Sequence, residues 1–160
     1  MAEVVKSFDL DHRKVKAPYV RLAGELDLGQ KLYKYDVRFL QPNTKRMTTM
    51  EAHSIEHLFA TYLRDYLDVI WDVSPMGCMT GFYVSTTESN IEKVLTAVLY
   101  ALVDVLKSDN MIAANDVQCG YYYTLNLQAA KEFVAPLIQQ MWNIQETIDI
   151  NRDEYPEIFE

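Results

Sequence analysis

The chain has 160 residues, of which 49% are hydrophobic and 24% charged, a composition typical of one globular domain. Its formal charge of −8 argues against a nucleic-acid partner, because no basic stripe is present to neutralise phosphates. The N-terminus lacks the apolar core of a signal peptide, and the longest apolar run, residues 94–106, is too short to span a bilayer. These features predict a cytoplasmic protein that binds neither nucleic acid nor membrane.

The sequence predicts one domain over residues 1–160, because no repeat, low-complexity segment or Pro/Gly-rich linker divides it. An acidic tail, from about residue 146, is expected to be solvated. Two cysteines, Cys78 and Cys119, are the whole thiol content. A lone disulfide is unusual in a reducing cytoplasm, so their roles are better sought in chemistry.

The first predicted elements lie between residues 31 and 67. The segment 31–39 alternates in polarity, which predicts a strand with one buried face. Its apolar positions are Tyr33, Tyr35, Val37 and Phe39. After the turn residues 41–43, Thr48 and Glu51 have the spacing of a capping box, which predicts a helix from there to about residue 67.

Shorter elements follow. Residues 69–73 and 80–85 are predicted to be strands joined by the turn SPMG. Ser89 and Glu92 form a second expected capping box, followed by an amphipathic helix. The apolar positions of that helix are Ile91, Val94, Leu95, Val98, Leu102, Val105 and Leu106.

The last third is predicted to contain one strand and one helix. Residues 116–125, DVQCGYYYTL, are typical of a strand, and a helix is expected to begin near residue 126. Pro136 should kink that helix or stop it about a turn short. Short turns between several strands favour an α+β fold, an antiparallel sheet packed against helices, over a doubly wound sheet.

The stretch EAHSIEHLF carries the clearest chemical signal. His53 and His57 are four residues apart, so on a helix they project from one face and their imidazoles can share a metal ion. The HxxEH pattern is that of inverted zincins, and Glu56 lies beside the second histidine, near enough to handle a proton on a bound molecule. By itself, the histidine spacing also fits two ordinary helix residues.

A catalytic metal needs a third protein ligand and one open position. The candidates are His12, Cys78 and Cys119. Cys119 lies next to a glycine on the expected strand, and Cys78 follows SPMG, a turn that holds a side chain at a rim. Either cysteine also fits an inert buried thiol. Proton transfer beside a carbonyl is a reaction that suits this set of groups: two histidines and one thiolate as metal ligands, one free thiol and one carboxylate.

Several motifs together resemble the S-ribosylhomocysteine lyases, the LuxS family of bacterial quorum-signal synthases. They are SFDLDHRKVKAPYVR, YDVRF, HSIEHLFATYLR, DVSPMGCMTGFYVS and VQCGYY, in the family's order from Ser7 to about Ala130. Two features depart from the family. The chain lacks a histidine that some members carry after the metal cysteine, and Pro136 lies where members usually continue a helix.

The resemblance implies a divalent metal in each subunit, held by His53, His57 and Cys119. Fe²⁺ is the expected native ion, with Zn²⁺ or Co²⁺ also accepted, and this donor set does not choose between them. Cys78 would be the thiolate base, with Arg38 as the nearest cation, and Glu56 the second acid or base.

The resemblance also implies substrate contacts and a partner. Ser7, His12 and Arg38 match residues that line the family's site, and Arg64 and Asp72 match positions near the homocysteine end of the substrate. Members are homodimers with active sites at the subunit interface. Ser7 and His12 lie far in sequence from the histidine helix, which fits a segment reaching across that interface.

The implied reaction moves the carbonyl of S-ribosylhomocysteine along its chain until β-elimination releases homocysteine. The second product is 4,5-dihydroxy-2,3-pentanedione, the precursor of autoinducer-2. Two alternatives remain open from the residues: an inverted-zincin metallopeptidase, in which Glu56 activates water, and a structural metal site that uses both cysteines as ligands.

Overall fold

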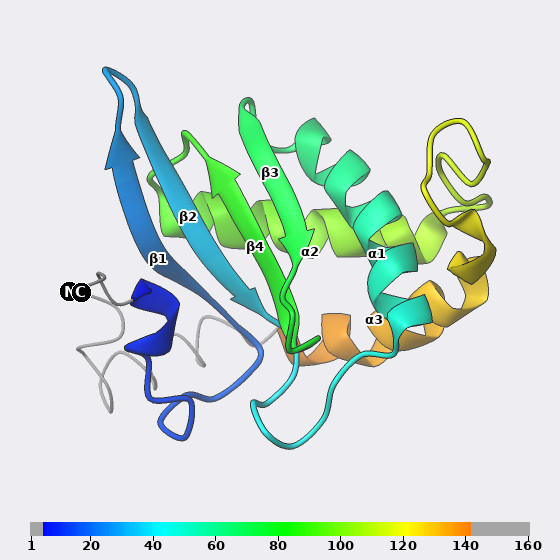
Figure 1. Ribbon diagram of the computed structural model, residues 1–160, viewed down its shortest axis with the longest axis horizontal. Helices are drawn as coiled ribbons and strands as arrows, with labels where there is room; N and C mark the ends of the chain where they lie inside the picture. The colour runs from blue at the N-terminus through cyan, green and yellow to red at the C-terminus, as the bar shows by residue number, and fades with distance from the viewer. Residues whose placement is uncertain (1–4, 142–160) are drawn as a thin grey trace.

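A four-stranded antiparallel sheet with the order β1-β2-β4-β3 forms the centre of the fold (Figure 1). The computed structural model describes residues 5–141. The strands are β1 Tyr19–Asp27, β2 Lys31–Arg38, β3 Ile70–Pro75 and β4 Gly81–Thr86. The helices are α1 Thr49–Tyr62, α2 Ile91–Lys107 and α3 Leu127–Met141, with short 3₁₀ turns η1 Lys6–Phe8, η2 Leu63–Asp65 and η3 Tyr122–Thr124. The predicted acidic tail lies outside the described residues.

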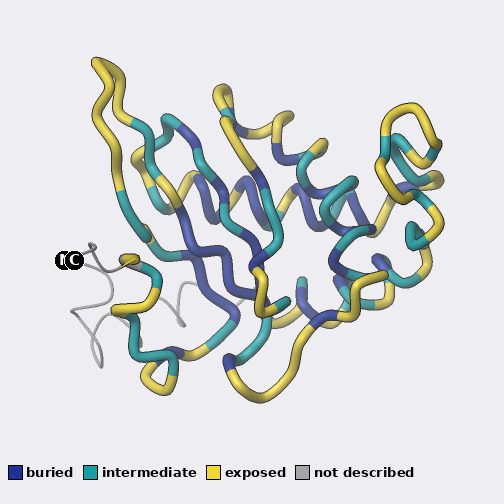
Figure 2. The backbone as a smooth tube through the Cα atoms, in the orientation of Figure 1, coloured by how far each residue is buried: buried dark blue, intermediate teal, exposed yellow. Residues whose placement is uncertain are grey.

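The three helices gather on one side of the sheet, which confirms the predicted α+β architecture (Figure 1). Buried residues concentrate where sheet and helices meet, whereas the tip of the β1–β2 hairpin is exposed (Figure 2). Phe39, Phe59 and Phe82 form the aromatic centre of the core, with ring centroids 5.6–5.9 Å apart. Within residues 5–141, no helix combines the length and apolarity that crossing a bilayer requires.

Strand β2 has the predicted inner face, but its outer face is not uniformly solvated. Tyr35 and Val37 are buried in the core, as expected from the alternation. On the opposite face Asp36 and Arg38 are also buried, because charged and aromatic side chains from β1 and the segment before it cover this end of the sheet. The prediction of a half-buried strand is therefore wrong at its C-terminal end.

Helix α1 begins as predicted and ends earlier. The Thr48 side chain accepts a hydrogen bond from the Glu51 amide, and Glu51 binds the Thr48 amide in return, a complete capping box. The regular helix ends at Tyr62 instead of residue 67, because the chain tightens into the 3₁₀ turn η2. That turn still buries Leu63 and is followed by the buried Leu67.

Helix α2 has a different cap from the one predicted. Asn90, not Ser89, accepts hydrogen bonds from the amides of Glu92 and Lys93, at 2.9 and 3.2 Å. The helix therefore starts one residue later than the Ser89 capping box requires. Its buried stripe contains the predicted apolar positions except Ile91, which is half-buried, and Leu106, which is 38% exposed.

The predicted strand over residues 116–125 is wrong. This segment is a turn followed by η3, and the Asn115 side chain binds the amides of Val117 and Gln118, which removes them from any ladder. Helix α3 was predicted correctly in position, but Pro136 does not stop it, since the helix continues to Met141. The loop that carries Cys119 therefore packs beside α1 as irregular chain.

Candidate metal centre and thiol cavity

Helix α1 presents His53 and His57 on one face, with ring centroids 4.8 Å apart and planes at 82°. Cys119 approaches them from the loop before η3, and its Sγ atom lies 3.4 Å from His53 Nε2. One ligand atom from each of the three residues lies within 4.8 Å of the others. The predicted ligand trio is therefore brought together.

The spacing of these atoms fits a transition metal. Tetrahedral bonds of about 2.0 Å to nitrogen and 2.3 Å to sulfur place the nitrogen and sulfur about 3.5 Å apart, close to the 3.4 Å between His53 Nε2 and Cys119 Sγ. Three protein ligands leave one position of a tetrahedron open, as in catalytic sites. Two imidazoles and a thiolate suit Fe²⁺, Zn²⁺ and Co²⁺ alike.

Both histidines are held by their outer nitrogens. His57 Nδ1 lies 2.8 Å from the Ile112 carbonyl oxygen, and His53 Nδ1 lies 2.6 Å from the Thr124 hydroxyl oxygen. Burial, and then the charge of His57, lower the pKa of His53, which favours the neutral imidazole that ligation needs. Thr124 was not predicted from the sequence, because a threonine in an irregular loop has no recognisable spacing.

Glu56 lies beside the metal group without belonging to it. It is half-buried, and burial is the main reason why its pKa is raised above the usual value. The charge of His57 opposes this shift, and the charge of Asp72 adds to it. A carboxyl group in this environment can hold a proton at higher pH than an exposed glutamate, which suits an acid–base role.

Cys78 has a separate environment at the turn between β3 and β4. Its exposed thiol lies 3.1 Å from the Thr80 hydroxyl and 4.0 Å from Arg38 Nη1, and Thr80 in turn accepts from Arg38 at 3.0 Å. A cavity of about 300 Å³ is lined by Cys78, Arg38, Thr80 and His12 together with Pro42 and Asn43. Thr80 is a second residue that the sequence analysis missed.

A buried ionic network fixes Arg38. Its guanidinium binds both Asp36 carboxylate oxygens at 2.8 and 3.0 Å, and Asp36 also accepts from Tyr19 at 3.1 Å and Arg21 at 3.3 Å. Burial alone would lower the pKa of Arg38, but the hydrogen bonds and charge of Asp36 raise it. Arg38 is therefore a fixed cation whose Nη1 side faces the thiol.

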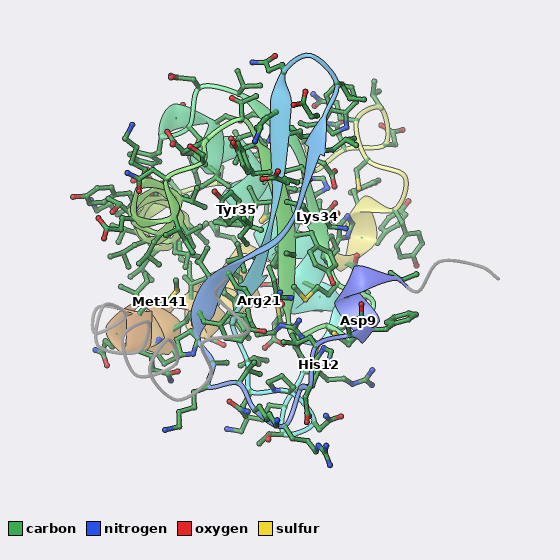
Figure 3. All side chains as sticks on the ribbon, turned by 90° about the vertical axis from the view of Figure 1, so that its left-hand side faces the viewer. Asp9, His12, Arg21, Lys34, Tyr35 and Met141 are labelled. Atoms are coloured by element: carbon green, nitrogen blue, oxygen red, sulfur yellow. The ribbon has the colours of Figure 1, made fainter. Side chains whose placement is uncertain are left out.

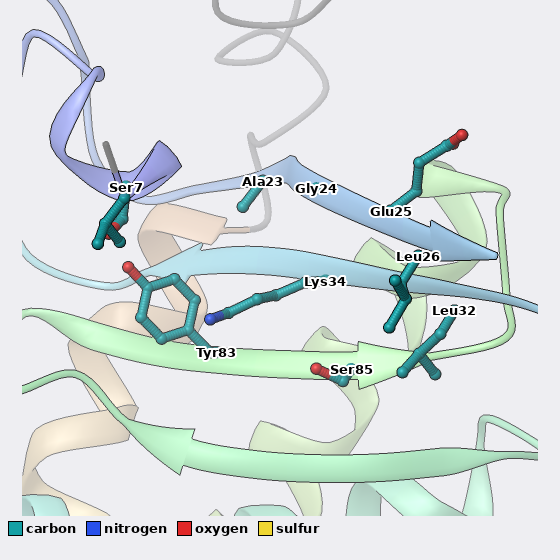
Figure 4. A pocket seen from close by; sticks show the side chains of 10 residues that line it. Ser7, Ala23, Gly24, Glu25, Leu26, Leu32, Lys34, Tyr83 and Ser85 are labelled. Carbon is teal, nitrogen blue, oxygen red and sulfur yellow. The ribbon is translucent and has the colours of Figure 1, made fainter. Parts of the chain in front are cut away.

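The remaining predicted site residues lie further apart. Ser7 lines a different cavity of about 320 Å³ on the outer face of the sheet, with Lys34 and Tyr83 (Figure 4). Arg64, in η2, donates to the Ala60 carbonyl in the last turn of α1. Asp72 lies on β3, accepts from Ser74 at 2.8 Å and is close enough to influence Glu56.

The family model for S-ribosylhomocysteinase (LuxS) matches residues 5–148. The chain belongs to this family. It is 46% identical over 145 residues to the S-ribosylhomocysteine lyase of Clostridium botulinum, covering 89% of this chain and 96% of that protein. It is 42% identical over 158 residues to the lyase of Halobacillus halophilus, covering 97% of each, and 44% identical over 152 residues to that of Deinococcus radiodurans, covering 92% and 96%.

Membership of the LuxS family fits the separation of the two cysteines. A structural metal site with both cysteines as ligands does not fit, because Cys119 joins the two histidines whereas Cys78 contacts Thr80 and Arg38. A metallopeptidase would have no use for the Cys78 cavity. The LuxS family therefore accounts for both groups of residues.

Proposed function

We propose that this protein is a metal-dependent lyase that converts S-ribosylhomocysteine into homocysteine and 4,5-dihydroxy-2,3-pentanedione. The observation that carries the proposal is the grouping of His53, His57 and Cys119 in a chain whose LuxS family match spans residues 5–148. Fe²⁺ stays the expected native ion and Zn²⁺ or Co²⁺ the expected substitutes. When bound, the divalent cation supplies electrostatic stabilisation of negative charge on substrate oxygens.

The reaction needs repeated proton transfers beside a carbonyl. The ribosyl carbonyl starts at C1, and the thioether at C5 leaves only when the proton on C4 is acidic, which requires the carbonyl at C3. Cys78 is assigned the protons on carbon, because its thiol is exposed in a cavity large enough to admit part of a substrate. Glu56 is assigned those on oxygen, because its raised pKa lets it alternate between acid and base.

Arg38 and Thr80 act on the thiol. The guanidinium, 4.0 Å from Cys78 Sγ, stabilises negative charge that develops there, and the Thr80 hydroxyl, 3.1 Å away, is able to donate to a thiolate. His12 lines the same cavity and is assigned to the substrate's hydroxyl groups. Ser7, Arg64 and Asp72 are kept as proposed contacts to the remainder of the substrate.

The active unit is proposed to be a homodimer. Cys78, Arg38 and His12 line one cavity, whereas His53, His57 and Glu56 project from α1, and none of these α1 residues lines that cavity. We define the first group as the thiol half-site and the second, with Cys119, as the metal half-site. A complete site forms when the thiol half-site of one subunit meets the metal half-site of the other.

The outer face of the sheet is the proposed contact surface. η1 lies against it, and Leu26 and Leu32 form an apolar end of its cavity (Figure 4), which Val5 also lines. Val5 and Phe8 of the N-terminal segment are 56% and 77% exposed. His12 follows this segment at the same end of the molecule (Figure 3). A cytoplasmic location also stays a prediction.

Release of a free thiol from S-ribosylhomocysteine, followed with a thiol-reactive dye, tests the function. The metal-loaded protein should release one thiol for each substrate consumed and leave peptides intact. A chelator should abolish the release, and added Fe²⁺ or Co²⁺ should restore it. Metal-dependent peptide cleavage without thiol release would overturn the proposal.

A further inference from the structure

The loop from Ile112 to Thr124, which carries Cys119, is attached to α1 at both ends by the two histidines. His57 Nδ1 meets the Ile112 carbonyl oxygen at 2.8 Å, seven residues before the cysteine, and His53 Nδ1 meets the Thr124 hydroxyl at 2.6 Å, five residues after it. Between these points the chain has little regular structure, and Val117, Tyr121 and Tyr123 are 89%, 64% and 72% exposed. The inner nitrogens and the cysteine are thereby left facing one another.

The two attachments differ chemically. A backbone carbonyl only accepts hydrogen bonds, so His57 must carry its proton on Nδ1 to bind it. The lone pair of His57 Nε2 is then available to bind a metal ion. A hydroxyl both donates and accepts, so at His53 the choice of tautomer depends on where the Thr124 hydrogen points. The Tyr121 carbonyl oxygen lies 3.4 Å from Thr124 Oγ1 and receives that hydrogen. The hydroxyl oxygen is then the acceptor for His53 Nδ1–H.

We propose that Thr124 is a positioning residue of the metal centre: its hydroxyl fixes the ring and tautomer of His53 and holds the Cys119 loop against α1. This inference rests on the proposed ligand set of His53, His57 and Cys119. Without the hydroxyl, the His53 ring is free to rotate and to carry its proton on Nε2, the atom 3.4 Å from Cys119 Sγ. Partners of this kind typically change metal affinity by about 10- to 100-fold.

A second contact keeps α3 attached to α1 when Thr124 is changed, so the effect of Thr124 on the metal centre can be measured by itself. The Asn126 amide donates to the buried Ser54 hydroxyl at 2.8 Å, which fixes the start of α3 on α1 independently of the metal centre. Loss of the Thr124 hydroxyl should therefore disturb the His53 ring and the loop without detaching α3. The variant is expected to fold, so its metal binding is measurable.

Three variants separate the positioning role from a general effect of the substitution. Thr124→Val removes the hydroxyl and keeps the shape, whereas Thr124→Ser keeps the hydroxyl. Thr96→Val is the matched control, since the Thr96 hydroxyl binds only the Glu92 carbonyl of its own exposed helix turn, at 2.8 Å. Metal affinity is measured by competition with a chromophoric chelator for Zn²⁺, and the ligand geometry by the absorption spectrum of the Co²⁺ form. The thermal midpoint of each apo-protein reports folding.

Thr124→Val should bind Zn²⁺ about 10-fold more weakly or worse, with an altered Co²⁺ spectrum and an apo-protein midpoint close to that of Thr96→Val. Thr124→Ser should recover the wild-type affinity and spectrum. Equal affinities for Thr124→Val and wild type, or a Thr124→Ser variant as weak as Thr124→Val, would overturn the role of the hydroxyl. Cys119→Ser tests the ligand set separately, because undiminished metal binding there would refute the metal site itself.

Discussion

The two free cysteines have surroundings that suit different tasks. Cys119 is partly buried and points at an imidazole nitrogen 3.4 Å away, as a metal ligand does. Cys78 is exposed and faces the Thr80 hydroxyl and the Arg38 guanidinium. These partners stabilise a thiolate and leave it free to accept a proton. The thiol of Cys119 is thus assigned to metal binding, and the thiol of Cys78 to proton transfer.

The two cysteine variants should fail in different ways. Cys119→Ala should lose its metal, its activity, and the stability that the bound ion provides. Cys78→Ala should keep one metal ion per chain and a wild-type thermal midpoint, yet release no thiol from S-ribosylhomocysteine. Metal analysis beside thiol-release kinetics distinguishes them. If Cys78→Ala loses the metal and Cys119→Ala retains it, the two assignments are reversed.

Asp36 should matter although it touches no proposed substrate atom. Asp36→Asn leaves Arg38, which is 2% exposed, without its carboxylate, and breaking a buried ion pair in this way costs roughly 3 kcal/mol. The free energy of unfolding in urea should fall by about that amount, and thiol release should slow because the guanidinium no longer has a fixed position. Lys93→Gln, at an exposed pair with Glu88, is the control and should hardly change either value. A stable, fully active Asp36→Asn variant would contradict the claim that Asp36 holds Arg38 in place for the reaction.

At this scale, spacing in the sequence was enough to predict that His53 and His57 lie together on one face of α1, because residues four apart on a helix return to one face. It was not enough to find Thr80 and Thr124. The Thr80 hydroxyl contacts Arg38, which is 42 positions away in the sequence, and the Thr124 hydroxyl contacts His53, which is 71 positions away. No local pattern encodes such contacts. The burial of Asp36 was missed for the same reason, since it depends on β1 crossing beside β2.

Helix α2 shows how the start of an element depends on one side chain. Asn90 caps the amides of Glu92 and Lys93, so Asn90→Ala should lower the free energy of unfolding by about 1 kcal/mol. Ser89→Ala, at the position that the capping-box pattern indicated, should change it little. Urea unfolding of both variants measures the difference. If Ser89→Ala lowered the free energy of unfolding more than Asn90→Ala, Ser89 and not Asn90 would be the residue that caps α2.

The loop from Ile112 to Thr124 shows where element prediction fails. Three consecutive tyrosines and a valine have high β-propensity, which favours a strand when no tertiary context is known. Among residues 5–141 this segment has no neighbouring strand with which to pair, and the Asn115 side chain accepts hydrogen bonds from two of its amides. By contrast, α1, α2, β2, β3 and β4 were predicted because their periodicity extends over whole elements, whereas β1, Tyr19–Asp27, was not predicted.

On the scale of the whole molecule, our proposal gives each chain two incomplete sites. The thiol half-site is built from β2, the β3–β4 turn and the segment around His12, and the metal half-site from α1 and the Cys119 loop. From the sequence, the segment that carries Ser7 and His12 was expected to reach across the subunit interface. Since His12 and Cys78 line the same cavity of one chain, they should enter a composite site together.

Mixing of inactive subunits tests this arrangement. Glu56→Gln inactivates a metal half-site and Cys78→Ala a thiol half-site. After subunit exchange, half of the dimers are mixed, and each mixed dimer has one site in which both halves are intact. About a quarter of wild-type activity should therefore return, as thiol release measured after exchange has been confirmed by mass spectrometry.

The pair His12→Ala and Cys78→Ala is the matched control for this experiment. Both substitutions fall in the thiol half-site, so each site of a mixed dimer contains one damaged half and no activity should return. Recovery with this pair would place His12 and Cys78 in different sites. Absence of recovery with Glu56→Gln and Cys78→Ala, when exchange is complete, would place both half-sites in one chain. Sedimentation of the wild-type protein as a monomer would exclude the composite site altogether.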